Sequence, residues 1–211
     1  MPDDGHNPEV RAYDRDIMGY SATSPVDGAV FYSGMSPTSG EWNWRRAQAY
    51  VAAQPPRRAA TIDHTPCGQN LVAKGLSLDA RRPGPVSHAA AAKVWEGASK
   101  RFALEASGRV TCFVDGARAK GTFRRAEFPA LLANSQVSHV NGISTPELRN
   151  EKNAVRAFHR VEDVSRDLQP QRVPPIRTKT IAPTLAQRPL SREAAGQRPL
   201  PSTGRTLGRS R

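Results

Sequence analysis

The stretch that decides the fold is residues 87–114, with the sequence SHAAAAKVWEGASKRFALEASGRVTCFV. Ser87 is a good N-cap and Gly108 a good C-terminal stop, so this stretch predicts the longest helix of the chain between them. Four residues recur at helical spacing and share one face of that helix: Trp95, Ser99, Phe102 and Ala106. The run Arg109–Val114 then predicts a strand, and Asp115-Gly116 predicts a turn directly after it.

Further strands and helices are predicted on both sides of this stretch. Apolar runs predict strands over residues 28–34, 58–63 and 137–140, and residues 120–123 are expected to pair with the 109–114 strand as a hairpin. Helical patterns cover residues 44–54, 65–74 and 128–133. The alternation favours an α/β fold with a small, mainly parallel sheet and flanking helices. Ligands bind at the carboxyl ends of such strands, where Tyr32, Ser33 and Asp63 fall.

The positive charge of the chain is concentrated near its C-terminus. The 211 residues include 31 Lys and Arg and 19 Asp and Glu, a formal net charge of +12. Residues 169–211 hold nine of the basic residues, seven prolines and a single acid, Glu193, which gives +8. This composition predicts a disordered basic tail, because it offers too little apolar surface to offset the entropy of ordering. Ahead of it we expect a weakly ordered arm over residues 1–27, a folded domain over 28–143 and a charged extension with a helical pattern over 144–168.

Cysteine content and hydropathy set further bounds. The two cysteines, Cys67 and Cys112, cannot build a disulfide framework, which favours a reducing compartment or export in a form that needs no disulfides. No apolar stretch approaches the roughly 20 residues of a membrane helix, and the first residues show no signal-peptide pattern. We therefore expect no membrane association.

Taken alone, the candidate reactive residues leave several chemistries open. His64 and Cys67 have His-x-x-Cys spacing, but no second ligand pair exists, so a loop histidine and a core cysteine are favoured over zinc. Ser33, His64 and an aspartate could form a triad, yet no G-x-S-x-G elbow accompanies them. The sequence also contains no P-loop and no G-x-G-x-x-G motif.

Three further positions carry both structural and functional interpretations. Trp95 is either a core residue or an aromatic platform beside the Ser99 hydroxyl. Asp63 directly follows an apolar run and is either a turn residue or a ligand. Glu127 precedes Phe128-Pro129, where the dipole of a short helix favours an acid.

An ordered set of segments resembles the ADP-ribosyl cyclase family, and in particular its short bacterial relatives found as toxin domains. The set comprises Phe31-Tyr-Ser-Gly34, Ala60-Thr-Ile-Asp-His-Thr65, Val94-Trp-Glu-Gly-Ala-Ser-Lys-Arg-Phe-Ala103 and Val110-Thr-Cys-Phe-Val-Asp-Gly-Ala-Arg-Ala-Lys120. The resemblance covers about residues 28–143. It implies a fold of that family and cleavage of the bond between nicotinamide and ribose in NAD.

The resemblance also implies roles for particular residues. Glu127 matches the glutamate that faces the oxocarbenium-like transition state, and Trp95 matches the tryptophan that stacks on nicotinamide. Ser99 matches the serine near the ribose, and Asp63 stands where a glutamate contacts the carboxamide. The residues implied to bind substrate are Tyr32, Ser33, Lys100 and Phe128. Gly34 replaces a phosphate-binding arginine, for which Lys100 or Arg101 are candidate substitutes.

The expected function is that of an NAD (or NADP) glycohydrolase, which needs no cofactor and also forms cyclic ADP-ribose where the adenine ring captures the intermediate. The resemblance further implies a bacterial toxin or effector, an immunity protein that blocks its cleft, and a location in the bacterial cytoplasm or export by a specialised secretion system. Two alternatives stay open: a nucleic-acid-binding protein that uses the basic tail without specific recognition, and an ADP-ribosyltransferase.

Overall fold

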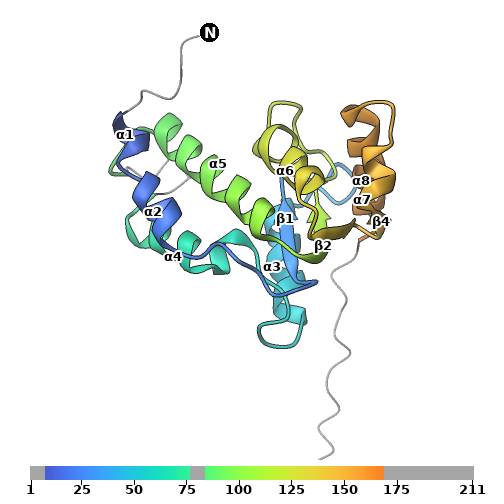
Figure 1. Cartoon of the computed structure of the whole chain (residues 1–211), viewed down its shortest axis with the longest axis horizontal. Helices are drawn as coiled ribbons and strands as arrows, with labels where there is room; N and C mark the ends of the chain where they lie inside the picture. The colour runs from blue at the N-terminus through green and yellow to red at the C-terminus, as the bar shows by residue number, and fades with distance from the viewer. Residues whose placement is uncertain (1–7, 77–83, 169–211) are drawn as a thin grey trace, which may run out of the picture. The chain divides into compact units, whose positions relative to one another are not determined.

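A computed structural model of the chain describes residues 8–76 and 84–168 (Figure 1). Its sheet has the strand order β1 (Ala29–Tyr32), β2 (Gly108–Phe113), β3 (Val137–Val140) and β4 (Ile143–Ser144). The pairs β1–β2 and β2–β3 are parallel, and β3–β4 is antiparallel. The fold class is therefore confirmed: α/β, with a small and mainly parallel sheet flanked by helices.

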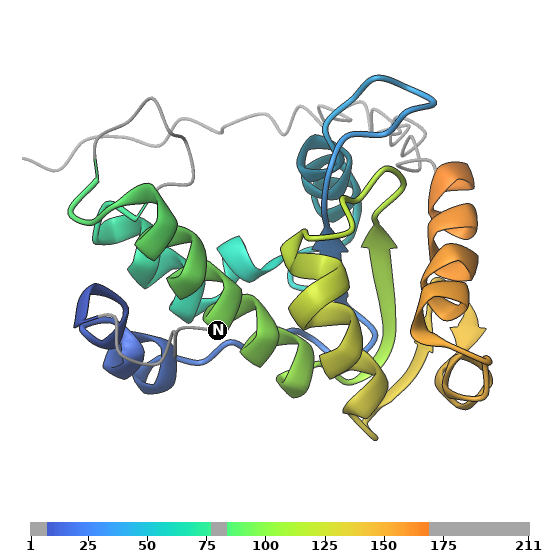
Figure 2. The ribbon, with the colours of Figure 1, turned by 90° about the horizontal axis from the view of Figure 1, so that it is seen from above.

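Helices cover both faces of β1 and β2. Phe31 and Val110 belong to the main apolar core, which includes residues of α5 (His88–Glu105) and α6 (Phe128–Ala133). Val30 and Phe113 point the other way and pack against α3 (Asn43–Ala53). Figure 2 shows α5 and α6 in front of these strands and α3 behind them. Ala29, Val30 and Phe31 form a continuous apolar run, as expected for a strand that is buried on both faces.

The long helix begins where its N-cap predicts it and ends three residues before Gly108, the predicted C-terminal stop. The Ser87 hydroxyl accepts from the Ala90 N–H over 3.2 Å, and α5 ends at Glu105. Gly108 starts β2 at a φ of +74°, which a side chain would strain. The four residues predicted to share one helical face are all buried: Trp95, Ser99, Phe102 and Ala106. The remaining helices of the main domain are α4 (Pro66–Ala73), α7 (Thr145–Arg149) and α8 (Ala154–Asp167).

Two predicted strand segments are wrong. In the 58–63 run, Ala60 makes an isolated bridge to Ala29, and the chain then turns into the 3₁₀ helix η2 (Ile62–His64). A capping box between Thr61 and His64 stabilises that turn against extension. The predicted hairpin at 120–123 is instead a turn followed by the π-helix η3 (Phe123–Glu127), which continues into α6. Phe123 is drawn into a buried aromatic cluster with Phe31 and Phe128, which competes successfully with strand pairing.

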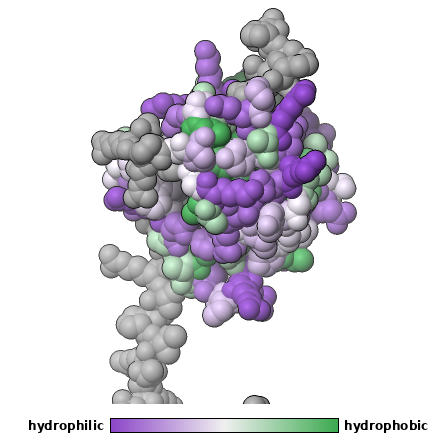
Figure 3. Space-filling model, turned by 90° about the vertical axis from the view of Figure 1, so that its left-hand side faces the viewer, coloured by the Kyte–Doolittle hydropathy of each residue, from purple (hydrophilic) through white to green (hydrophobic). Residues whose placement is uncertain are grey.

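The N-terminal residues that the structure describes are helical where the sequence predicted a weakly ordered arm. They form α1 (Pro8–Arg11) and α2 (Asp14–Gly19), and Ile17 of α2 is buried in the main core. Arg101 of α5 donates to the carbonyls of Ile17 and Tyr20, which fixes the end of α2. The face on this side of the molecule is mostly hydrophilic, with scattered apolar patches (Figure 3). Isolated apolar side chains are normal on a protein surface.

The tail predicted over residues 169–211 lies outside the described residues, and the domain boundaries remain a prediction. Within the described ranges, no helix is both long and apolar enough to cross a membrane.

Candidate active site

Tyr32 and Asp63 meet at the carboxyl end of β1. Tyr32 is the last residue of β1, and its hydroxyl donates to Asp63 Oδ2 over 2.6 Å. Asp63 lies in η2, where the Thr61 hydroxyl donates to the same oxygen over 3.2 Å. Two hydroxyl donors from two segments thus fix the position of the half-exposed Asp63 carboxylate.

Glu127 is a buried carboxyl at the junction of η3 and α6. Glu127 is the last residue of the π-helix η3, in which the Phe128 N–H donates to the Phe123 carbonyl. Burial raises the pKa of Glu127 to about 8; a hydrogen bond from the Ser99 hydroxyl opposes this rise, and the charge of Glu96 adds to it. π-helices are uncommon and often mark functional sites, as do carboxyls with strongly raised pKa values. Glu127 is therefore the strongest candidate for a reacting group.

Electrostatic interactions join Glu127 to the Tyr32–Asp63 pair. Burial raises the pKa of the Tyr32 hydroxyl, and the charges of Asp63 and Glu127 raise it further. The pKa of Cys112, on β2, is also raised by burial and by Glu127. One cluster of interacting side chains therefore joins Cys112 of β2 to four predicted site residues from β1, η2, α5 and η3: Tyr32, Asp63, Ser99 and Glu127.

Trp95 lies one helical turn before Ser99 on α5. Its ring is only 8% exposed, and its indole N–H donates to the Leu76 carbonyl over 3.1 Å. The hydrogen bond fixes the orientation of the ring, and the spacing places it on the same helical face as Ser99. Trp95 is thus both part of the core and adjacent to the cluster.

Ser33 lies where the loops after β1 and β2 pack together. Gly34 has a φ of +77°, and a Cβ there would lie 2.5 Å from the Gly116 carbonyl oxygen. A Cβ at Gly121 would lie 3.5 Å from Ser33 Oγ, so the 116–122 loop borders Ser33. That loop carries two exposed basic residues, Arg118 and Lys120.

The other residues proposed to bind substrate lie in different surroundings. Phe128 is buried, and its ring packs against Phe123 and Phe158. Lys100 is exposed on α5, next to Ser99 in sequence. Arg101 pairs with Glu105 through Nε and holds the end of α2 through Nη1.

The geometry does not favour the metal alternative. Cys67 is fully buried, with its Sγ directed at the Ile17 carbonyl, while His64 Nδ1 bonds to Thr61. Among residues 8–76 and 84–168, no group of three or more His, Cys, Asp or Glu side chains is arranged to hold a metal ion.

A buried polar network that the sequence analysis missed supports the two loops. Asn43 Nδ2 donates to the carbonyls of Ser33 and Asp115 over 2.8 and 2.9 Å. Arg46 forms an ion pair with Asp115, and Ser165 of α8 donates to the same carboxylate over 3.0 Å. These residues come from α3, the β2 loop and α8, and no local pattern in the sequence links them.

The comparisons with known proteins find no matching protein-family model and no matching curated protein. Similar solved structures include an Aplysia cyclase complexed with the substrate NGD and the product cGDPR (23% identity, TM-score 0.38) and an ADP ribosyl cyclase complexed with N1-cIDPR (22%, 0.40). Each of these matches covers 55% of this chain and 48% of the other, so the chain spans about half the length of those cyclases. A structure of CD38 matches at 21% identity with a TM-score of 0.44, over 74% of this chain and 68% of that one.

Proposed function

We propose that this chain cleaves the N-glycosidic bond between nicotinamide and ribose in NAD. The observation that carries the proposal is the burial of Glu127 in one cluster with Ser99, Tyr32 and Asp63, one helical turn from Trp95. The ordered motifs that resemble the ADP-ribosyl cyclase family supply these same residues, and this agreement between sequence and geometry supports the assignment.

The reaction separates charge in a way that suits a buried carboxylate. As the C1′–N bond breaks, its electron pair leaves with nicotinamide, which becomes neutral, and the ribosyl carbon becomes positive. The ionised Glu127 carboxylate faces this positive centre and lowers the barrier, because opposite charges interact strongly where water is excluded. Ser99, through its hydrogen bond, favours the ionised form of Glu127.

Trp95 and Asp63 are assigned to the nicotinamide. The flat indole ring stacks on the planar leaving group and excludes water from it. The Asp63 carboxylate, held by Tyr32 and Thr61, accepts from the carboxamide N–H. Both residues act by orienting the ring that leaves.

We assign the diphosphate to the loop that borders Ser33. Gly34 cannot supply the cation expected at its position, and Arg101 is engaged with α2. Arg118 and Lys120 are exposed and directly precede Gly121, which lies beside the Ser33 hydroxyl. A guanidinium and an ammonium there suit two phosphate charges.

Water is the proposed acceptor of the ribosyl cation. Water adds to C1′ and loses a proton, which gives ADP-ribose. Capture by the adenine ring would give cyclic ADP-ribose, but it requires the substrate to fold back on itself. Hydrolysis needs no such pose and is therefore the favoured outcome; no cofactor takes part.

The test is release of nicotinamide from NAD and NADP by the purified full chain, with the sugar products separated by chromatography. Replacing Glu127 with Gln should lower the rate by about 10²–10³-fold, since the charge facing the cation is lost. Asp163→Asn is the matched control, because it neutralises an exposed carboxylate on α8. No release by the wild type, or full activity of Glu127→Gln, would contradict the proposal. If the NAD is labelled in its ADP-ribose part, label retained on a protein target would instead identify an ADP-ribosyltransferase.

The biological role we propose is that of a bacterial toxin or effector that depletes NAD, exported by a specialised secretion system, with an immunity protein that covers the cleft. This part rests on the sequence resemblance alone. Expression in bacteria should lower cellular NAD and arrest growth, and Glu127→Gln should do neither. Growth arrest by both forms would contradict this role.

A further inference from the structure

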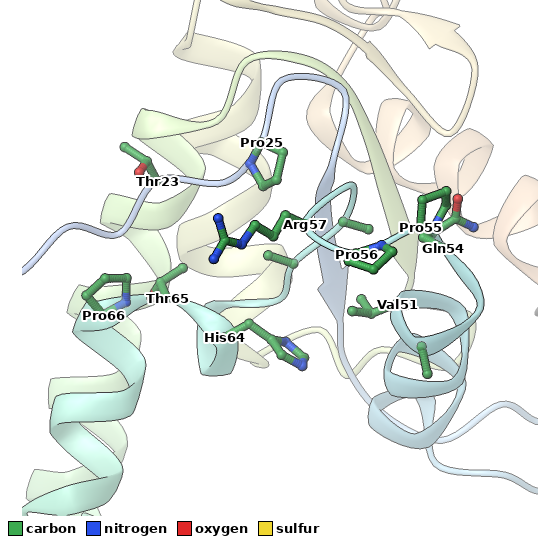
Figure 4. Close-up of a pocket in the computed structure, with 13 residues that line it drawn as sticks. Thr23, Pro25, Val51, Gln54, Pro55, Pro56, Arg57, His64, Thr65 and Pro66 are labelled. Carbon is green, nitrogen blue, oxygen red and sulfur yellow. The ribbon is translucent and has the colours of Figure 1, made fainter. Parts of the chain in front are cut away.

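We propose that a cavity lined by none of the proposed catalytic or substrate-binding residues binds a small molecule that joins a flat apolar ring to an anionic group. The cavity has a volume of about 490 Å³ and lies between the end of α3, the turn that follows it and the start of α4 (Figure 4). Cavities of about 300–1,000 Å³ are typical of small-molecule sites. Nothing in the proposed NAD chemistry uses this cavity, so the proposal stands independently of it.

The walls of the cavity are apolar and stiff. Small apolar side chains from α3 and the 59–60 segment line it. Four prolines complete the walls: Pro25, Pro55, Pro56 and Pro66. Proline rings have no rotamer freedom to lose, so a ligand would find a surface that is already ordered. Flat, rigid apolar walls suit an aromatic or heteroaromatic ring.

The polar side of the cavity is cationic. Arg57 and His64 both line it and extend into the space between α3 and α4 (Figure 4). Among the lining residues, all of which the structure describes, none is acidic. His64 Nδ1 is engaged with Thr61, whose hydroxyl oxygen lies 2.8 Å away, so Nε2 is the ring nitrogen that can face a ligand. The Arg57 guanidinium is complementary to a carboxylate, sulfonate or phosphate, and the His64 ring lines the same cavity.

The backbone of Arg57 supplies an independent observation. Its φ is +62°, in the left-handed region that glycine and asparagine favour. It occupies the third position of a tight turn closed by the Arg58 N–H and the Pro55 carbonyl over 3.0 Å. Glycine would adopt this turn conformation with less strain, but arginine brings a cation to the cavity. Backbone strain of this kind is typical of binding sites.

The probe we choose is naphthoate, with uncharged naphthalenemethanol as its counterpart, titrated into the full chain and followed by calorimetry and NMR. Wild type should bind naphthoate more tightly than the alcohol. Val51→Trp, which fills the cavity, should abolish binding, whereas Val72→Trp, on the exposed side of α4, should not. Arg57→Gln should weaken naphthoate about tenfold or more and leave the alcohol unchanged, because it removes a charged hydrogen-bond donor.

Arg58→Gln is the matched charge control, since Arg58 neighbours Arg57 without lining the cavity. Its affinity for naphthoate should equal that of wild type. Arg57→Gly should fold with unchanged or higher thermal stability while losing the preference for naphthoate, which separates binding from folding. Equal affinity for both probes, or naphthoate binding that survives Val51→Trp, would overturn the proposal.

Discussion

The Tyr32 hydroxyl lies 2.6 Å from Asp63 Oδ2, which joins the last residue of β1 to a 3₁₀ turn 31 residues later in the sequence. A charge-assisted hydrogen bond of this length is among the stronger polar contacts in a protein. It holds a carboxylate and an aromatic ring together beside Glu127. The relationship gives Tyr32 a role that its position alone did not reveal: it positions Asp63.

Replacing Tyr32 with Phe should therefore affect how substrate is positioned more than the chemical step. Asp63 keeps the Thr61 hydroxyl as a donor, so the loss should be limited to roughly one hydrogen bond to a charged group, about 1.5–3 kcal/mol. We expect KM for NAD to rise about tenfold with a smaller change in kcat. Steady-state kinetics of nicotinamide release measure both constants. If kcat fell as far as in Glu127→Gln, Tyr32 would have a direct part in the reaction.

The pKa of Glu127, raised to about 8 by burial, predicts the pH dependence of activity. The ionised form is the one that faces the positive transition state, so kcat/KM should rise tenfold per pH unit below about pH 8 and level off above it. The cationic nicotinamide ring of bound NAD favours the ionised form, so the corresponding limb of kcat should lie at lower pH. Rates measured between pH 5 and 10 test both statements. A limb near pH 4 would show that Glu127 is not held in an apolar site.

The same shift has a consequence for stability, with a definite sign. Glu127 has a higher pKa folded than unfolded, so the folded state binds more protons between about pH 4.5 and 8. The contribution of Glu127 to stability is therefore complete at low pH and is lost as pH rises through 8. Glu127→Gln, which stays neutral, should be more stable than wild type at pH 9, by a few kcal/mol at most. Denaturant unfolding at pH 5 and pH 9 measures this difference; its absence at pH 9 would contradict the burial of the charge.

Local signals predicted the elements whose stability is local. The Ser87 cap, the Pro66 start of α4 and the Phe128–Ala133 helix all follow from neighbouring residues, and the structure has them at or within a residue or two of the predicted bounds. The two segments wrongly predicted as strands have apolar residues that suit a strand as well as those of the strands that do form. What excluded them was non-local: the contact of Phe123 with Phe31, 92 positions away, and a side-chain capping box at Thr61.

The candidate site was predictable only in part for the same reason. The ordered motifs pointed to Glu127, Trp95, Ser99 and Asp63 as candidates, but the sequence did not predict the contacts that these residues make. The Tyr32–Asp63 bond and the π-helix that ends at Glu127 depend on how β1, η2 and η3 come together. Nothing in the spacing of Arg46, Asp115 and Ser165 indicates that they share one buried network.

That network yields the last prediction. Arg46 and Asp115 are almost fully buried, and Arg46 also donates to the Ser165 and Leu168 carbonyls at the end of α8. Arg46→Met should destabilise the fold by about 3–5 kcal/mol, because it leaves the Asp115 charge buried without its cation. The double variant Arg46→Met with Asp115→Asn should recover a large part of that loss, since the uncompensated charge is gone.

Denaturant unfolding of the two single variants and the double variant gives the coupling energy directly. Arg45→Met supplies the control. Arg45 is one position away on the exposed face of α3, so this substitution should change stability by less than about 0.5 kcal/mol. Additive effects of the Arg46 and Asp115 substitutions would mean that the pair does not join α3 to the loop after β2. Strong coupling would show that the Arg46–Asp115 pair joins α3 to the loop after β2, so that α3 supports the candidate site without contacting substrate.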